Sequence, residues 1–455
     1  MRPEGTRQAS FAPRSADPSA ARPRAAPASF LGGAIGRLLP PSVPFRYFGA
    51  AALFHLLAWL ALLANAGDVA RFRGGLGWPL AALHLVTLGV LVMTALGASV
   101  QLFPVATRQP LQSAREPVLA WWLYAPGVAL TGLGIGTRFV PLLVAGAVLV
   151  GLGLVIYAIV LARNLAGARG MPVVVAYGWT AWASLVVALA AALSLVGAYA
   201  GVPTIARDSA LALHVPFAAY GFLGMLALGL AHVVVPMFAL SQATDERAAF
   251  AAFALALAAL ALAGIAAFTL RTPLRIAAAS TAIVAVTLHW RAMQAAIRTG
   301  MRRDLGRGFR LVRVGWAMLV VNLLIALAMA ANVPFDALPT LFGFALIVGW
   351  LLTYVLGMLH RIVPFLASMH AARGKHRPPT PSSLAAGRAP GFHVVAHLAA
   401  MALLVVAIVA DSPWLVRAAA LVGAAGASAF LLFVARVIAR MLGAQRNGHE
   451  RGVTA

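Results

Sequence analysis

A motif that runs from glycine to proline occurs three times in the chain, each time at the end of a long apolar stretch. The copies are residues 97–104 (GASVQLFP), 229–236 (GLAHVVVP) and 357–364 (GMLHRIVP), and their prolines lie 132 and then 128 residues apart. Each interval can hold about four membrane crossings, so the repeat predicts three similar four-helix units.

The composition indicates a membrane protein, because 62% of the residues are hydrophobic, 10% are charged and the mean hydropathy is +0.90. A membrane span needs about 20 apolar residues, and the segments lack the alternating pattern of barrel strands. We therefore expect an all-α polytopic membrane protein, with about twelve transmembrane helices in a pseudo-threefold arrangement of four-helix units. The predicted spans are 45–67, 78–106, 118–139, 141–163, 176–199, 209–240, 247–270, 273–298, 310–333, 337–366, 393–410 and 413–435.

The distribution of positive charge predicts the orientation of these spans. With the N-terminus inside, 28 of the 35 Lys and Arg residues fall on the cytoplasmic side, as the positive-inside rule requires. Both termini are then cytoplasmic, and the protein belongs in a bacterial inner (cytoplasmic) membrane. The net charge of +24 is explained by contact with the lipid bilayer, and nucleic-acid binding is not expected.

The same reasoning divides the chain into three parts. Residues 1–44 are rich in Ala, Pro, Ser and Arg and are predicted to form a disordered basic cytoplasmic tail. Residues 45–443 form the twelve-helix membrane domain, and residues 444–455 form a second cytoplasmic tail.

The residue inventory leaves histidine as the main candidate for chemistry within the membrane. The chain has no cysteine, and its 11 Asp and Glu residues are all predicted to lie in tails or loops. A proton relay through carboxylates is therefore not expected. His84 lies 20 residues before Pro104 and His214 lies 22 before Pro236, both about 9 Å inside the outer face. The two alternatives for this pair are ligation of a metal or haem and interhelical hydrogen bonding. We interpret the histidines nearer the cytoplasmic side as forming interhelical hydrogen bonds.

The spans that carry these residues resemble the catalytic subunit (subunit I) of the heme-copper oxidases, which also has twelve helices in a pseudo-threefold arrangement. The segment HLVTLGVLVMTALGASVQLFPV is similar to the family's helix two, and HVPFAAYGFLGMLALGLAHVVVPMF is similar to helix six of its high-oxygen-affinity branch. The resemblance implies that His84 ligates a low-spin haem and that His214 takes the position of a copper ligand, with an offset of two residues.

The departures from the family are equally informative. Phe342 and Phe344 stand where the family's helix ten has its two haem-ligating histidines, and residues 247–270 contain no histidine where helix seven has copper ligands. Copper is therefore not expected, and conventional oxygen or nitric-oxide reduction is disfavoured. At most one haem b could bind through His84, with His55 or His214 as the sixth ligand.

Two hypotheses follow for the function. The first is a haem-associated redox or gas-sensing protein without a binuclear centre, with electron-transfer partners in a respiratory membrane. The alternative is a non-catalytic protein on the same scaffold that serves respiratory-complex assembly, metal handling or small-molecule passage.

Overall fold

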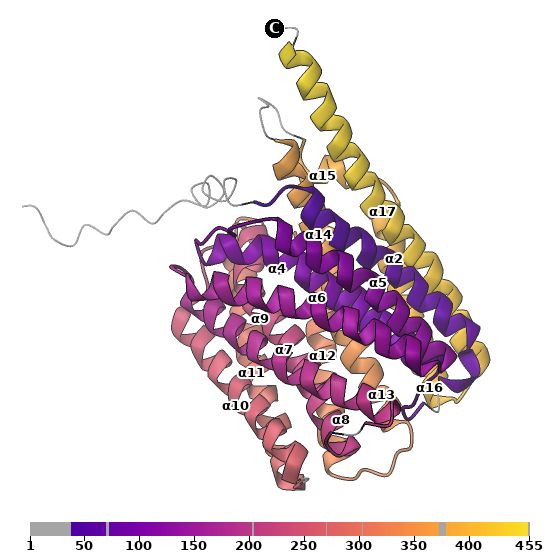
Figure 1. Ribbon diagram of the computed structural model, residues 1–455. Helices are drawn as coiled ribbons and strands as arrows, with labels where there is room; N and C mark the ends of the chain where they lie inside the picture. The colour runs from indigo at the N-terminus through magenta and orange to yellow at the C-terminus, as the bar shows by residue number, and fades with distance from the viewer. Residues whose placement is uncertain are drawn as a thin grey trace, which may run out of the picture.

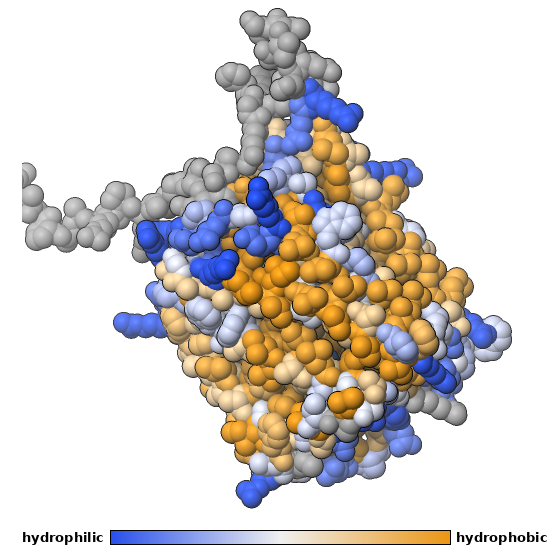
Figure 2. Space-filling model, in the orientation of Figure 1, coloured by the Kyte–Doolittle hydropathy of each residue, from blue (hydrophilic) through white to orange (hydrophobic). Residues whose placement is uncertain are grey.

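A computed structural model describes residues 38–69, 72–202, 204–269, 271–302, 304–372 and 379–453, with side chains to Arg446. Twelve helices in this part of the chain are long and apolar enough to cross a membrane, which confirms the predicted fold class. They form one elongated bundle (Figure 1). Its visible face has a broad hydrophobic surface with hydrophilic residues near the upper and lower edges (Figure 2). The protein is a polytopic integral membrane protein whose apolar side chains face lipid.

Nine of the twelve crossings are single uninterrupted α-helices. Their bounds are α2 Ser42–Ala64, α5 Arg115–Thr137, α6 Val140–Ala166, α7 Pro172–Tyr199, α10 Glu246–Thr269, α11 Thr272–Thr299, α12 Gly308–Ala330, α16 Ala389–Val409 and α17 Pro413–Val453. Two short helices, η1 Ala66–Asp68 and α15 Pro381–Leu384, lie in connections.

The other three crossings each contain a π-helical segment between two α-helical parts. They are α3 Trp78–His84, η2 Leu85–Val92 and α4 Met93–Ala106; α8 Arg207–Pro216, η3 Phe217–Gly224 and α9 Met225–Ala239; and α13 Leu338–Phe344, η4 Ala345–Leu352 and α14 Thr353–Ala371. Each π segment begins 19 residues before the motif's proline, so the repeat extends to backbone geometry. The segments also meet at the centre of the bundle, where η4 contacts both η2 and η3.

The motif's glycine has the same packing role in each copy. A Cβ atom at Gly97 would lie 2.6 Å from the Cβ of Tyr47, and one at Gly229 would lie 2.6 Å from the Cβ of Tyr177. At Gly357 it would lie 2.8 Å from the backbone nitrogen of Val312. The glycine therefore lets the π-containing helix of each unit pack closely against the helix that begins the unit.

Helix ends differ slightly from the sequence-based boundaries. The first helix begins at Ser42 rather than residue 45, and Glu116 and Asp208 lie in the first turns of α5 and α8 rather than in loops. Acidic side chains are favourable at helix N-termini because of the positive end of the helix dipole. Of the predicted tails, residues 1–37 lie outside the described residues, and α17 continues through residues 444–453 beyond the bundle (Figure 1).

Candidate functional site

The predicted outer pair, His84 and His214, lies at the ends of two helical parts that lead into π segments. His84 is the last residue of α3, and His214 lies three residues before η3. Both side chains are half-buried, and His214 is near enough to His84 to interact with it electrostatically. The structure therefore brings these two residues to the same region of the bundle.

Both outer imidazoles are held by a backbone carbonyl. The Nδ1 atom of His84 lies 2.9 Å from the carbonyl oxygen of Leu80, and Nδ1 of His214 lies 3.1 Å from that of Ala188. A carbonyl oxygen can only accept a hydrogen bond, so Nδ1 is the protonated nitrogen in each ring. The lone pair of each Nε2 is then available to a ligand, as in histidines that bind metals.

The two phenylalanines that replace the family's haem ligands pack as ordinary apolar residues. Phe344 is buried in a hydrophobic cluster that includes Met401, and Phe342 is partly buried. Neither side chain can coordinate a metal.

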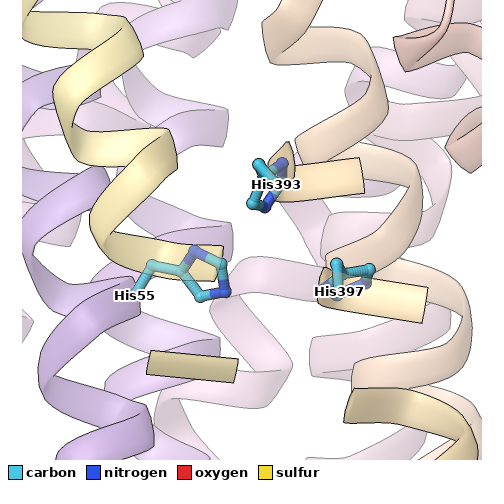
Figure 3. Close-up of side chains that lie close together, drawn as sticks. All are labelled: His55, His393 and His397. Atoms are coloured by element: carbon cyan, nitrogen blue, oxygen red, sulfur yellow. The ribbon is translucent and has the colours of Figure 1, made fainter. Parts of the chain in front are cut away.

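A second group of histidines lies elsewhere in the bundle, and it is the tightest collection of possible metal ligands among the described residues. It consists of His55 from α2 with His393 and His397 from α16, and one ring nitrogen of each lies within 4.8 Å of those of the other two. The three rings face a shared space between their helices (Figure 3). We call these residues the histidine cluster. Its side chains are 0–2% exposed.

The histidine cluster forms where the last helices of the chain close against the first. Helix α17 packs against both α2 and α16. Its Phe430 lies against the rings of His393 and His55, with centroid distances of 4.8 and 6.1 Å. His360 of α14 stacks on His393 at 5.0 Å and donates from Nδ1 to the carbonyl of Leu356. Aromatic rings thus surround the cluster.

Two neighbouring side chains orient the rings of the cluster. The indole nitrogen of Trp59 donates a hydrogen bond to Nε2 of His55 at 3.1 Å. The hydroxyl of Thr353 lies 2.7 Å from the carbonyl oxygen of Val348, to which it can donate, and 2.8 Å from Nε2 of His397. Thr353 then accepts from Nε2 of His397, which leaves the Nδ1 lone pair of His397 free to bind a ligand.

Several nitrogens of the cluster have no hydrogen-bond partner. Neither nitrogen of His393 has one, and Nδ1 of His55 also lacks one, although all three atoms are buried. A buried polar atom without a partner costs about 1–3 kcal/mol, so buried imidazole nitrogens of this kind are candidate ligand atoms. Interhelical hydrogen bonding was predicted for these histidines. His397 forms such a bond with Thr353, whereas His393 forms none.

Sequence reasoning did not find the histidine cluster, although part of the signal was present. His393 and His397 are four residues apart and therefore share one face of a helix. The contribution of His55, 338 residues earlier, could be known only from the tertiary structure. His55 and His214 were the two candidates for a sixth haem ligand, and the ring of His55 lies with those of His393 and His397.

A further buried pair lies in the second unit. The rings of His232 and His289 are 5.1 Å apart, and Nδ1 of His232 is 2.8 Å from the hydroxyl of Thr244. With two histidines, this pair offers fewer ligands than the histidine cluster.

No protein-family model matches the chain, and a search of curated proteins finds no similar sequence. The resemblance to the heme-copper oxidases stays a prediction from the helix motifs, and the functional argument depends on the geometry of the sites.

Proposed function

We propose that the protein is a metal-handling membrane protein that holds a transition-metal ion in the histidine cluster. The observation that carries this proposal is the convergence of three buried imidazoles within 4.8 Å of one another. Imidazole nitrogen is a good ligand for zinc, copper, iron and nickel. An ion at this position would take one nitrogen from each ring, including one of the two nitrogens of His393 that have no hydrogen-bond partner.

The surroundings favour binding over catalysis. A catalytic metal site keeps an open coordination position for water or substrate, whereas a closed site holds its ion through protein ligands alone. Phe430 and His360 pack against rings of the histidine cluster, and the three ligands are almost completely buried. The proposal therefore corresponds to the metal-handling alternative on an oxidase-like scaffold.

Metal analysis of the purified full-length protein tests this function. We expect about one equivalent of transition metal per chain after reconstitution, and loss of that equivalent in His393→Ala. His289→Ala is the matched control, because it removes a buried histidine outside the cluster. Equal metal content in the wild type and His393→Ala would refute the proposal.

Haem association through His84 is a second candidate function, favoured by the geometry of the outer pair. The Nε2 lone pairs of His84 and His214 are available in the same region of the bundle. This supports the oxidase-like hypothesis of at most one haem b in a redox or gas-sensing role, without a binuclear centre. Bound haem would supply one-electron or gas-binding chemistry at this position.

Spectra of the dithionite-reduced protein separate the two candidates. If haem is bound, His84→Ala should abolish its Soret and alpha bands, whereas His360→Ala should leave them nearly unchanged. Two haems per chain, or substantial oxygen turnover by the single subunit, would contradict the loss of the binuclear centre.

The orientation proposed for the bundle places both termini in the cytoplasm of a bacterial cell. It is supported by the charge asymmetry and by the even number of crossings. Reporter fusions at Arg446 and Ala206 should report the cytoplasm and the periplasm respectively. The same compartment at both positions would refute this topology.

A further inference from the structure

We infer that the ion taken by the histidine cluster is copper(I). This inference rests on the proposed metal-handling function and goes further by naming the charge and the element. Copper was not expected at the position that the oxidase family uses, near His214. The histidine cluster uses different helices, so that expectation does not apply to it.

The first argument is electrostatic. Imidazole ligands bring no negative charge, and no Asp or Glu is among the buried side chains of the described residues. An ion in the cluster would keep its full charge inside the bilayer. The cost of removing an ion from water rises with the square of its charge, so a divalent ion costs about four times as much as a monovalent ion of equal size. The site therefore favours a monovalent metal.

The second argument is the number of ligands. The cluster offers three nitrogens within 4.8 Å of one another, and His360 is not part of this group. Zinc in closed sites is almost always tetrahedral with four protein ligands. Copper(I) has a filled d shell and is stable with three ligands in a plane. The donor set matches copper(I) better than zinc.

The third argument is a soft sulfur atom beside the ligands. The hydroxyl of Thr353, which contacts Nε2 of His397, also lies 3.1 Å from the thioether sulfur of Met401. Thioethers select copper(I) over harder ions. Met401 and His397 lie four residues apart on α16, so the sulfur is a soft neighbour on the Nε2 side of the His397 ring.

Competition titrations test the identity of the ion in the full-length protein in detergent. Copper(I) would be titrated without oxygen, with ascorbate and bicinchoninate as the coloured competitor, and zinc(II) would be titrated against a fluorescent chelator. We expect one copper(I) per chain, bound at least 100-fold more tightly than zinc(II). X-ray absorption of the copper-loaded protein should show mainly nitrogen neighbours.

Variants connect the bound ion to the cluster. His393→Ala should lose more than about 100-fold in copper(I) affinity, because loss of an outer partner alone costs about 10–100-fold. His397→Gln provides a second ligand variant in case His393→Ala does not fold, as judged by size-exclusion chromatography. Met401→Leu should weaken copper(I) by about ten-fold and leave zinc(II) unchanged.

The outcomes distinguish the two levels of the proposal. Tighter zinc(II) binding that depends on His393 would overturn the copper assignment and preserve the metal-handling function. Copper(I) binding that is unchanged in both ligand variants would place the ion elsewhere and overturn the inference. Failure to bind any of zinc, copper(I), iron(II) or nickel(II) would overturn both.

Discussion

The outer histidine pair and the histidine cluster differ in almost every structural respect. His84 and His214 occupy related places in repeated units, are half-buried, and each has Nδ1 bonded to a backbone carbonyl. His55, His393 and His397 come from unrelated positions, are fully buried, and leave several nitrogens without partners. Position in a repeat thus identified one pair of histidines, while the convergence of three buried imidazoles identifies another group as candidate metal ligands.

The largest expected effect is the difference in metal affinity between variants of the outer pair and variants of the histidine cluster, because the two regions should act independently. The double variant His84→Ala/His214→Ala should keep metal affinity within about two-fold of the wild type, because distant sites usually act additively. His393→Ala should lower it by more than about 100-fold. Isothermal titration of both variants with the same metal checks the contrast. A large loss in the double variant would show that the regions are coupled.

The orienting role of Thr353 predicts the next largest effect. Thr353→Val keeps the shape of the side chain but removes the oxygen that contacts Nε2 of His397. We expect metal affinity to fall by about 10–100-fold, as for other outer-shell partners. Thr131→Val is the matched control, since the hydroxyl of Thr131 is buried without a partner. Equal affinities in the two variants would show that Thr353 does not orient the ring.

The close packing of the repeats predicts a loss of stability. A Cβ atom at Gly357 would meet backbone atoms of Val312 and Gly308 at 2.8 and 2.9 Å, so Gly357→Ala should cost about 1–3 kcal/mol. Gly343→Ala, in the same crossing, meets nothing within 4 Å and should be neutral or stabilising by about 0.5–1 kcal/mol. Unfolding in mixed detergent micelles measures both. Similar destabilisation by both variants would contradict the packing role.

The smallest expected effect concerns Trp59, whose indole competes with the metal for His55. The indole donates to Nε2 of His55, so the proton of that ring lies on Nδ1. Binding through either nitrogen disrupts this hydrogen bond, which contributes about 0.5–1.5 kcal/mol. Trp59→Phe should therefore raise metal affinity by about 2- to 10-fold in the titration described above. Weaker binding would indicate that the indole supports the bound state.

The fold could be predicted well from the sequence, because membrane insertion depends on local composition. All twelve crossings were expected from apolar length alone, and the repeat spacing from Gly97 to Pro364 predicted three related units. The π segments could not be foreseen. Their residues, such as those from Leu85 to Val92, have the same apolar composition as an α-helical span, and the difference depends on contacts at the bundle centre.

The candidate site was less predictable for a different physical reason. A buried imidazole looks the same in sequence whether it accepts a hydrogen bond, stacks on a ring or binds a metal. His232 and His360 both lie four residues before the motif's proline, yet the first pairs with His289 and the second stacks on His393. Only the neighbouring helices determine these outcomes, and α2 and α16 are far apart along the chain.

The three π segments also set the rotational phase of the helices that contain them. Each residue of an α-helix turns the chain by about 100°, and a π turn holds one more residue than an α turn. Deleting one residue from η2, for example Leu88, would rotate His84 by about 100° relative to Gly97. The inner packing against Tyr47 would persist, while His84 would turn away from its present neighbours. A single-residue deletion can thus rotate the outer half of a crossing relative to its inner half. A deletion at the matching position in either of the other two π segments would have the same effect.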